Sequence, residues 1–162
     1  MAIDYEGLLG SFVAESTERL GNAETAILRL EAGYNVELVN DVFRAFHTIK
    51  GDSGVFGLQS ITDTAHALEN VLEPLRSGAG EELSMDRIDA LLTGVDILRQ
   101  MVLDTGHADA VPVDNFHARL RALAVGSSAD SRPILRQEME RDVSGKFHIR
   151  LKKSFYEEAE RE

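Results

Sequence analysis

Cysteine is absent from this sequence of 162 residues. Its absence excludes a disulfide framework, a zinc–thiolate centre and a thiol nucleophile. The apolar runs are short, and none approaches the roughly 20 residues that a membrane-spanning helix requires. The acidic start, residues 1–6, lacks the basic and apolar regions of a secretion signal. Together these absences favour a cytoplasmic protein without a membrane-inserted segment.

Common signatures of catalysis are missing as well. The sequence contains no His-Glu-x-x-His metalloprotease motif, no phosphate-binding P-loop and no Gly-x-Ser-x-Gly hydrolase motif. It therefore offers no support for hydrolysis or for nucleotide binding by this chain. No repeat of fixed period appears, which argues against a solenoid.

Basic residues are few in the first part of the chain. Residues 1–125 contain 20 acidic and 9 basic side chains, whereas residues 126–162 contain 8 of each. The whole formal charge of −11 therefore belongs to the first part. Because an acidic surface repels nucleic-acid phosphates and anionic lipid, we expect no nucleic-acid partner and no membrane partner.

Five stretches carry apolar residues at helical spacing. They cover about residues 5–31, about residues 36–55, a segment that opens near Ser60 and stops before Ser77, a segment from Ser84 to about Thr105, and a shorter one after Pro112. Helices of about 20 residues joined by short turns predict an antiparallel bundle of four helices, running up-down-up-down, with a shorter fifth helix. The fold class is therefore expected to be all-α, with the bundle in residues 1–125.

Several residues predict how these helices begin, end and pack. Gly57 is placed for the left-handed position after the second helix. Ser60 and Asp63 have the spacing of a weak capping box for the third helix. Pro74 lies inside the third helix, so a backbone hydrogen bond is lost there and a kink near the end is expected. Leu8 and the remaining Phe and Leu side chains of the helices are assigned to the core.

The last part of the chain, residues 126–162, has a different composition. Residues 126–133 are rich in Gly, Ser and Asp and predict a linker. Residues 134–142 predict a short helix. Residues 147–152 alternate apolar and polar side chains, which predicts a strand. We expect a flexible tail or the start of a further domain.

One histidine of the second helix is placed for chemistry. At 100° per residue, His47 lies at the edge of the apolar stripe of that helix, which is formed by Val39, Val42, Phe43, Phe46 and Ile49. Lys50, Gly51 and Gly54 fall on the same edge, at i+3, i+4 and i+7 from the histidine. A glycine inside a helix costs about 1 kcal/mol relative to alanine. Two of them beside His47 therefore indicate that another protein surface comes close to this side chain.

The third helix offers acidic partners for this histidine. His66 and Glu69 share one of its faces, and Glu73 extends that face by a turn. If Glu69 accepts the Nδ1 proton of His47 across the helix pair, the other ring nitrogen is free to attack phosphorus. Lys50, protonated near neutral pH, would offset the negative charge of the phosphoryl group.

Two other interpretations of these residues stay open. His66 and Glu69 can also be an ordinary pair on a helix surface. Zinc held by His47, His66 and Glu69 is geometrically possible. Di-iron bundles, however, use two Glu-x-x-His sequences, whereas this chain has one His-x-x-Glu in the reverse order.

The segment His47-Thr48-Ile49-Lys50-Gly51, followed by Gly54, Phe56 and Gly57, resembles the phosphorylation motif of histidine phosphotransfer (HPt) domains. Within that family it is most similar to the N-terminal HPt domain of CheA-type chemotaxis histidine kinases. The spacing to His66-Ala67-Leu68-Glu69-Asn70 also resembles that group. The resemblance covers about residues 3–125.

This resemblance implies a phosphorelay role in two-component signal transduction. The ATP-binding catalytic domain of a histidine kinase, using ATP with Mg in trans, would phosphorylate His47. The phosphoryl group would then pass to an aspartate of a response regulator receiver domain. Lys50, His66 and Glu69 would activate or hydrogen-bond the histidine, Gly51 and Gly54 would give clearance for docking, and the chain itself would bind no cofactor or metal.

Two departures from the family pattern stand near the site. Asp52-Ser53 replaces residues that are often small and uncharged, and Pro74 is unusual in the third helix. The rival hypothesis from a different class is a helical protein-interaction module that is never phosphorylated.

Overall fold

A computed structural model describes residues 3–77, 83–125, 136–141 and 147–152 of the chain. The chain divides into two compact units, Met1–Ser127 and Ser128–Glu162. The helices of the first unit are α1 (Tyr5–Ala32), α2 (Val36–Val55), α3 (Gln59–Arg76), α4 (Met85–Leu103), the 3-10 helix η1 (Thr105–Ala110) and α5 (Asp114–Ala124). The second unit contributes two strands, β1 (Arg136–Arg141) and β2 (Phe147–Lys152).

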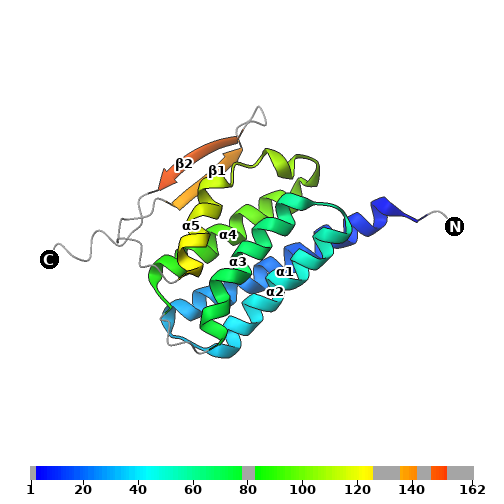
Figure 1. Ribbon diagram of the computed structural model, residues 1–162. Helices are drawn as coiled ribbons and strands as arrows, with labels where there is room; N and C mark the ends of the chain where they lie inside the picture. Colours follow the sequence, from blue (N-terminus) through cyan, green and yellow to red (C-terminus); the bar gives the residue numbers. More distant parts are fainter. Residues whose placement is uncertain (1–2, 78–82, 126–135, 142–146, 153–162) are drawn as a thin grey trace. The chain divides into compact units, whose positions relative to one another are not determined.

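The four long helices form a closed square of neighbours (Figure 1). α1 packs against α2 and α4, and α3 packs against the same two helices. α5 packs on α3, outside the square. The predicted all-α fold, an antiparallel bundle of four helices with a shorter fifth, is therefore confirmed. The segment η1, between α4 and α5, was not predicted.

The apolar stripes of the helices meet in one core. The largest side chains with less than 2% exposure, which come from all four long helices and from α5, are Phe46, Leu20, Ile27, Ile49, Ile61, Leu68, Leu72, Leu75, Leu91, Leu98, Met101 and Leu120. Burying a side chain of this size is worth about 1.5–3 kcal/mol. Burial of these stripes fixes how each helix is rotated about its axis, and that rotation decides which side chains of α2 and α3 face each other.

Three leucines that were assigned to the core are exposed. Leu8 is 51% exposed, Leu28 50% and Leu103 63%, so their assignment was wrong. Leu8 belongs to the first turns of α1, and this helix is longer than α2 and extends past it toward the N-terminus (Figure 1). Leu103 is the last residue of α4.

The turn between α2 and α3 fixes which turn of α3 lies beside which turn of α2. Gly57 has φ +67°, as predicted, a conformation that only glycine adopts without strain. The Leu58 N–H donates to the Ser53 carbonyl at 3.0 Å, and the Gly57 N–H donates to the Gly54 carbonyl at 3.1 Å. These two bonds are those of a Schellman motif, which closes a helix and directs the next segment back along it.

The capping box predicted at Ser60 is wrong. α3 begins at Gln59, its N-cap residue is Leu58, and no side chain caps it. Because the turn is tight, the helix already begins at Gln59, so Ser60 lies inside it and cannot act as its cap. The Ser60 hydroxyl instead donates to the Asp109 carboxylate of η1. Ser84, where the fourth helix was expected to begin, caps α4 by accepting a hydrogen bond from the Arg87 N–H at 3.3 Å.

Pro74 does not end α3. The helix continues to Arg76, and the Ser77 N–H donates to the Glu73 carbonyl at 3.1 Å. The Tyr34 hydroxyl, from the α1–α2 connection, donates to the Leu75 carbonyl at 2.8 Å and satisfies one acceptor of the last turn. The kink expected at Pro74 stays a prediction.

A glycine allows α4 to come close to α3 directly behind the site. A Cβ atom on Gly94 would collide with the methyl groups of Leu68, which is fully buried. Only a glycine fits here without displacing Leu68. Because Leu68 is fixed against α4, the next residue of α3, Glu69, is turned toward α2.

In the second unit, β1 and β2 pair as an antiparallel hairpin, with Met139 opposite Ile149. The predicted strand at residues 147–152 is confirmed. The short helix predicted at residues 134–142 is wrong, because residues 136–141 form β1. That segment contains a single apolar residue, Met139, so it has no apolar stripe to stabilise a helix, whereas β2 supplies backbone hydrogen bonds along its whole length. The predicted linker at residues 126–133 lies outside the described residues.

No helix in the described part of the chain combines the length and apolarity needed to cross a membrane.

A histidine links α5 to α3. Thr64 is fully buried, and its hydroxyl donates to the Ser60 carbonyl at 2.8 Å. Its oxygen therefore accepts from Nε2–H of His117, at 2.9 Å. Burial lowers the pKa of His117 and outweighs the opposite effects of the Asp63 and Asp114 carboxylates.

This lowered pKa predicts a pH dependence of stability. The unfolded chain binds the His117 proton more readily than the folded protein does. The contribution of His117 is therefore fully present above a pH of about 6.5 and is lost as pH falls through the folded pKa. Urea denaturation of wild type and His117→Gln between about pH 8 and pH 5 should show a smaller loss of stability in the variant on acidification. Equal pH profiles for the two proteins would contradict this assignment.

Candidate functional site

His47 lies on α2 with one edge toward α3 and the rest of its ring in solvent. Its side chain is 62% exposed. Gly51 and Gly54 follow on the same edge of the helix. A Cβ atom on either glycine would meet no atom within 4 Å. These glycines therefore do not relieve crowding inside the molecule, and the space beside His47 is open to a partner.

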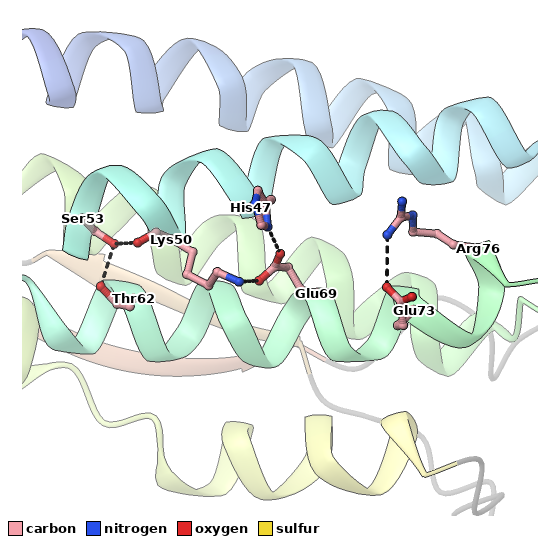
Figure 2. A network of polar contacts seen from close by, with 7 residues as sticks. All are labelled: His47, Lys50, Ser53, Thr62, Glu69, Glu73 and Arg76. Carbon is pink, nitrogen blue, oxygen red and sulfur yellow. Dashed lines mark hydrogen bonds and ion pairs between the residues drawn. The ribbon is translucent and has the colours of Figure 1, made fainter. Parts of the chain in front are cut away.

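The inner edge of the imidazole is held by Glu69. The Glu69 side chain is 4% exposed, and its Oε1 lies 2.6 Å from Nδ1 of His47 (Figure 2). A carboxylate can only accept a hydrogen bond, so Nδ1 carries the proton. In the neutral ring the lone pair then belongs to Nε2. The contact predicted between Glu69 and Nδ1 is present in the structure.

Lys50 neutralises the same carboxylate. Its Nζ lies 2.6 Å from Oε2 of Glu69, and its side chain is 28% exposed. The sequence placed Lys50 beside a phosphoryl group on His47, whereas the structure ties it to Glu69. A carboxylate this buried needs a charged partner, because desolvation would otherwise favour its neutral form. Lys50 thus gives one oxygen of Glu69 a charged partner, while the other oxygen accepts the hydrogen bond from Nδ1 of His47.

Two hydroxyls fasten α2 to α3 one turn beyond Lys50. Ser53 is fully buried, and its Oγ lies 2.8 Å from Oγ1 of Thr62 and 3.1 Å from the Lys50 carbonyl (Figure 2). Thr62 also reaches the Leu58 carbonyl at 3.1 Å. Two hydroxyl protons cannot serve all three contacts at once. When one hydroxyl donates to the other across the helix pair, the accepting hydroxyl donates to the carbonyl of its own chain segment. The small residue at Ser53 is required by this close packing.

The remaining predicted residues form no hydrogen bond or ion pair with His47 within the described part of the chain. His66 is exposed on α3, and its ring forms no hydrogen bond or ion pair with the described residues. Glu73 pairs with Arg76 on its own helix, Oε2 to Nη1 at 3.1 Å, and not with His47 (Figure 2). Phe43, which was assigned to the buried stripe of α2, is only half-buried and stacks on the His47 ring.

A metal site is not formed by the described side chains. No group of three His, Cys, Asp or Glu side chains among the described residues is placed to hold a metal ion. Both oxygens of Glu69 are already in contact, one with Nδ1 of His47 and one with Lys50. A metal ion bound to His47 and Glu69 would have to displace one of these partners.

Sequence reasoning missed three contributors, which are Ser53, Thr62 and Arg76. Ser53 and Thr62 have no charge or motif that points to a role, and only the distance between α2 and α3 shows it. Arg76 lies nearly two turns beyond Glu69 on α3, and its guanidinium carbon is 3.7 Å from the centre of the Phe43 ring. The i−4 spacing of Phe43 from His47 was the one available signal for the stacked pair.

The fold and the site together define a class of helical bundles that present one histidine, held at Nδ1 by a buried carboxylate, to a partner molecule. The family model described as Hpt domain matches residues 7–101. The chain belongs to the Hpt domain family, and the resemblance seen in the sequence is confirmed.

Bacterial proteins named chemotaxis protein CheA are similar to this chain. The chemotaxis protein CheA of Bacillus subtilis is 38% identical over 101 residues, which are 62% of this chain and 15% of that protein. CheA of Rhizobium meliloti is 35% identical over 139 residues, which are 81% of this chain and 18% of that protein. The chain thus spans less than a fifth of the length of these relatives.

Solved structures agree with the fold. The CheA phosphotransferase domain of Thermotoga maritima has a TM-score of 0.60 and 35% identity, and the match covers 64% of this chain and 99% of that one. The phosphorylated P1 domain of CheA3 from R. sphaeroides, in complex with CheY6, has a TM-score of 0.65 and 27% identity. That match covers 75% of this chain and 98% of the other.

The contact between Glu69 and Nδ1 predicts the tautomer of His47. A hydrogen bond to a charged group is worth about 1.5–3 kcal/mol, so Nδ1–H should be favoured about tenfold to hundredfold in the neutral ring. Proton–nitrogen correlation NMR spectra should show this tautomer in wild type and its loss in Glu69→Ala. Glu73→Ala is the matched control, since Glu73 lies one turn further on α3 and does not touch His47. An unchanged tautomer in Glu69→Ala would contradict the assignment.

Proposed function

We propose that this chain is the phosphocarrier domain of a CheA-like histidine kinase in chemotaxis-type signal transduction, with His47 as the phosphorylated residue. One observation carries the proposal: the Nε2 side of His47 is open to solvent, while buried Glu69 holds the proton on Nδ1. The imidazole is thereby prepared as a nucleophile at the atom that a partner can reach.

The first transfer would use ATP bound with Mg by a kinase catalytic domain. The Nε2 lone pair attacks the terminal phosphorus, an N–P bond forms, and the P–O bond to ADP breaks. The ring becomes positively charged and retains its Nδ1 proton. The Glu69 carboxylate, 2.6 Å from Nδ1, stabilises that charge through the same hydrogen bond that orients the neutral ring.

The second transfer would return the site to its starting state. A carboxylate oxygen of an aspartate on a response regulator receiver domain attacks the phosphorus. The N–P bond breaks, and its electron pair returns to Nε2 as a lone pair. Gly51 and Gly54 leave the surface beside His47 low enough for a receiver to bring its aspartate in line with the N–P bond.

Lys50 and His66 have supporting parts in this proposal. Lys50 pairs with Glu69 in the resting protein, and its Nζ would turn toward the phosphoryl group once His47 is phosphorylated. His66, exposed on the same helix as Glu69, is a candidate contact for the incoming phosphate. Residues 1–125 would form the carrier domain, and residues 126–162 would lead into the rest of the kinase.

Phosphorylation of His47 is tested by incubation with ATP and a matching kinase core. Wild type should acquire phosphate that is labile in acid and stable in alkali, and His47→Gln should acquire none. His107→Gln is a matched control, because His107 is 75% exposed and its Nδ1 also lies near a carboxylate, 2.9 Å from Oδ1 of Asp104. That variant should label like wild type.

This experiment separates the proposal from its rival, a helical interaction module that is never phosphorylated. Label on His47→Gln would place the phosphate on another residue. No label on wild type, from a kinase core that phosphorylates a known carrier, would favour the rival.

Clearance at Gly51 predicts a defect in transfer without a defect in folding. Gly51→Gln puts a flexible uncharged side chain into open space and should stabilise α2 by about 0.5–1 kcal/mol, since glycine is a poor helix former. The same side chain would obstruct an approaching domain and slow transfer to and from His47. Ala118→Gln, at an exposed position of α5, is the control and should leave the rate unchanged. A Gly51→Gln protein with wild-type transfer would remove the docking role of this glycine.

A further inference from the structure

A second aromatic ring lies against the imidazole of His47. Phe43 precedes it by one turn on α2, and the two rings are nearly parallel, with 14° between their planes and 5.9 Å between their centroids. Phe43 is half-buried, whereas Phe46 of the same helix is fully buried in the core. Phe43 is therefore placed at the edge of the bundle, where its contacts are with the site as much as with the interior.

Phe43 is covered in turn by a cation from the end of α3. The guanidinium carbon of Arg76 lies 3.7 Å from the centroid of the Phe43 ring. Two hydrogen bonds hold this guanidinium, from Nε to Oδ1 of Asn40 at 2.9 Å and from Nη1 to Oε2 of Glu73 at 3.1 Å. Asn40, which binds Arg76, stands three residues before Phe43, and His47 stands four residues after it. Arg76 and His47 therefore contact Phe43 from opposite directions along α2. Figure 2 shows Glu73 and Arg76 further along α3 than Glu69, which contacts His47 of α2.

The hydrogen bond to Glu69 alone does not fix the imidazole. It restrains one atom, Nδ1, and leaves the ring able to swing about the line that joins Nδ1 to the carboxylate. Because the side chain is 62% exposed, little packing other than that of the Phe43 ring can oppose this movement. The direction of the Nε2 lone pair depends on the ring plane. A contact with the face of the ring is therefore needed to set that direction.

We propose that Phe43 and Arg76 are positioning residues for phosphoryl transfer, which hold the plane of the His47 ring through the stack Arg76–Phe43–His47. Arg76 restrains Phe43, and Phe43 restrains the imidazole, so that the Nε2 lone pair points outward for in-line attack. The part that concerns transfer rests on the proposed function, whereas the ordering of the ring does not.

The size of the effect follows from the strength of such contacts. Aromatic pairs at this separation are worth about 0.5–1.5 kcal/mol beyond their burial, so loss of the stack should slow transfer by about two- to tenfold. The loss should appear in the rate at saturating donor and leave KM unchanged, because Phe43 orients the ring and is not proposed to bind the donor.

The experiment compares Phe43→Leu, Phe43→Tyr and Arg76→Lys with wild type. The first removes the ring and keeps an apolar side chain, the second keeps the ring, and the third keeps the charge without the planar guanidinium. Phe116→Leu is the control, since it removes a buried ring from α5 at a distance from α2. One arm measures the order and rotamer of the His47 ring by NMR relaxation and coupling constants, without phosphorylation. The other arm measures phosphoryl transfer from a kinase core with ATP.

The expected result is a more mobile imidazole and two- to tenfold slower transfer in Phe43→Leu, an intermediate loss in Arg76→Lys, and wild-type behaviour in Phe43→Tyr and Phe116→Leu. An imidazole that stays ordered in Phe43→Leu would overturn the proposal. So would a mobile ring with an unchanged transfer rate, or an equal loss in Phe43→Tyr. If wild type is not phosphorylated at all, the proposed function fails, and the NMR arm alone decides whether the stack orders the ring.

Discussion

The carboxylate of Glu69 lies between two side chains of the neighbouring helix, and the site depends on this one arrangement. A carboxylate that is 4% exposed is costly to keep ionised unless each oxygen has a partner. His47 and Lys50 stand one turn apart on α2 and supply both partners. The arrangement requires α2 and α3 to pack closely at one height. The packing of the core thus brings the Glu69 carboxylate to Nδ1 and sets the tautomer of the histidine, and the contacts of Glu69 in turn add to the packing of the two helices.

The two edges of the His47 ring have opposite surroundings. Nδ1 contacts the buried Glu69 carboxylate, whereas the His47 side chain as a whole is 62% exposed and the two glycines on the same edge of α2 add no side chain beside it. A group that accepts and releases a phosphoryl anion needs both conditions. In the proposed function, the contact at Nδ1 sets the tautomer of the ring, and the exposed side of the ring admits the partner domains. The stacked Phe43 adds a restraint on the ring face without closing the open edge.

Helical periodicity in the sequence predicts much of the fold and of the candidate site. The angular position of His47 at the edge of the α2 stripe, and of Glu69 on one face of α3, follows from spacing alone, and these are the residues that meet. Periodicity describes each helix separately, so it could not show that Lys50 turns to Glu69, nor that Arg76 reaches back to Phe43. Such contacts depend on rotamers of long side chains and on the distance between helices. The expectation of a helix at residues 134–142 failed for a related reason, since a strand is stabilised there by pairing with β2, whose paired residues lie further along the chain.

The Schellman turn at Gly57 also gives the chain between His47 and Glu69 a fixed length. His47 and Glu69 are joined by the end of α2, this turn and the first half of α3, and no loop of adjustable length interrupts them. Inserting or deleting one residue in either helical part would rotate the distal side chain by about 100° and shift it by about 1.5 Å. The carboxylate would then miss the imidazole. Homologous chains that use this chemistry should therefore vary in composition along this segment while keeping its length, and should place their insertions elsewhere.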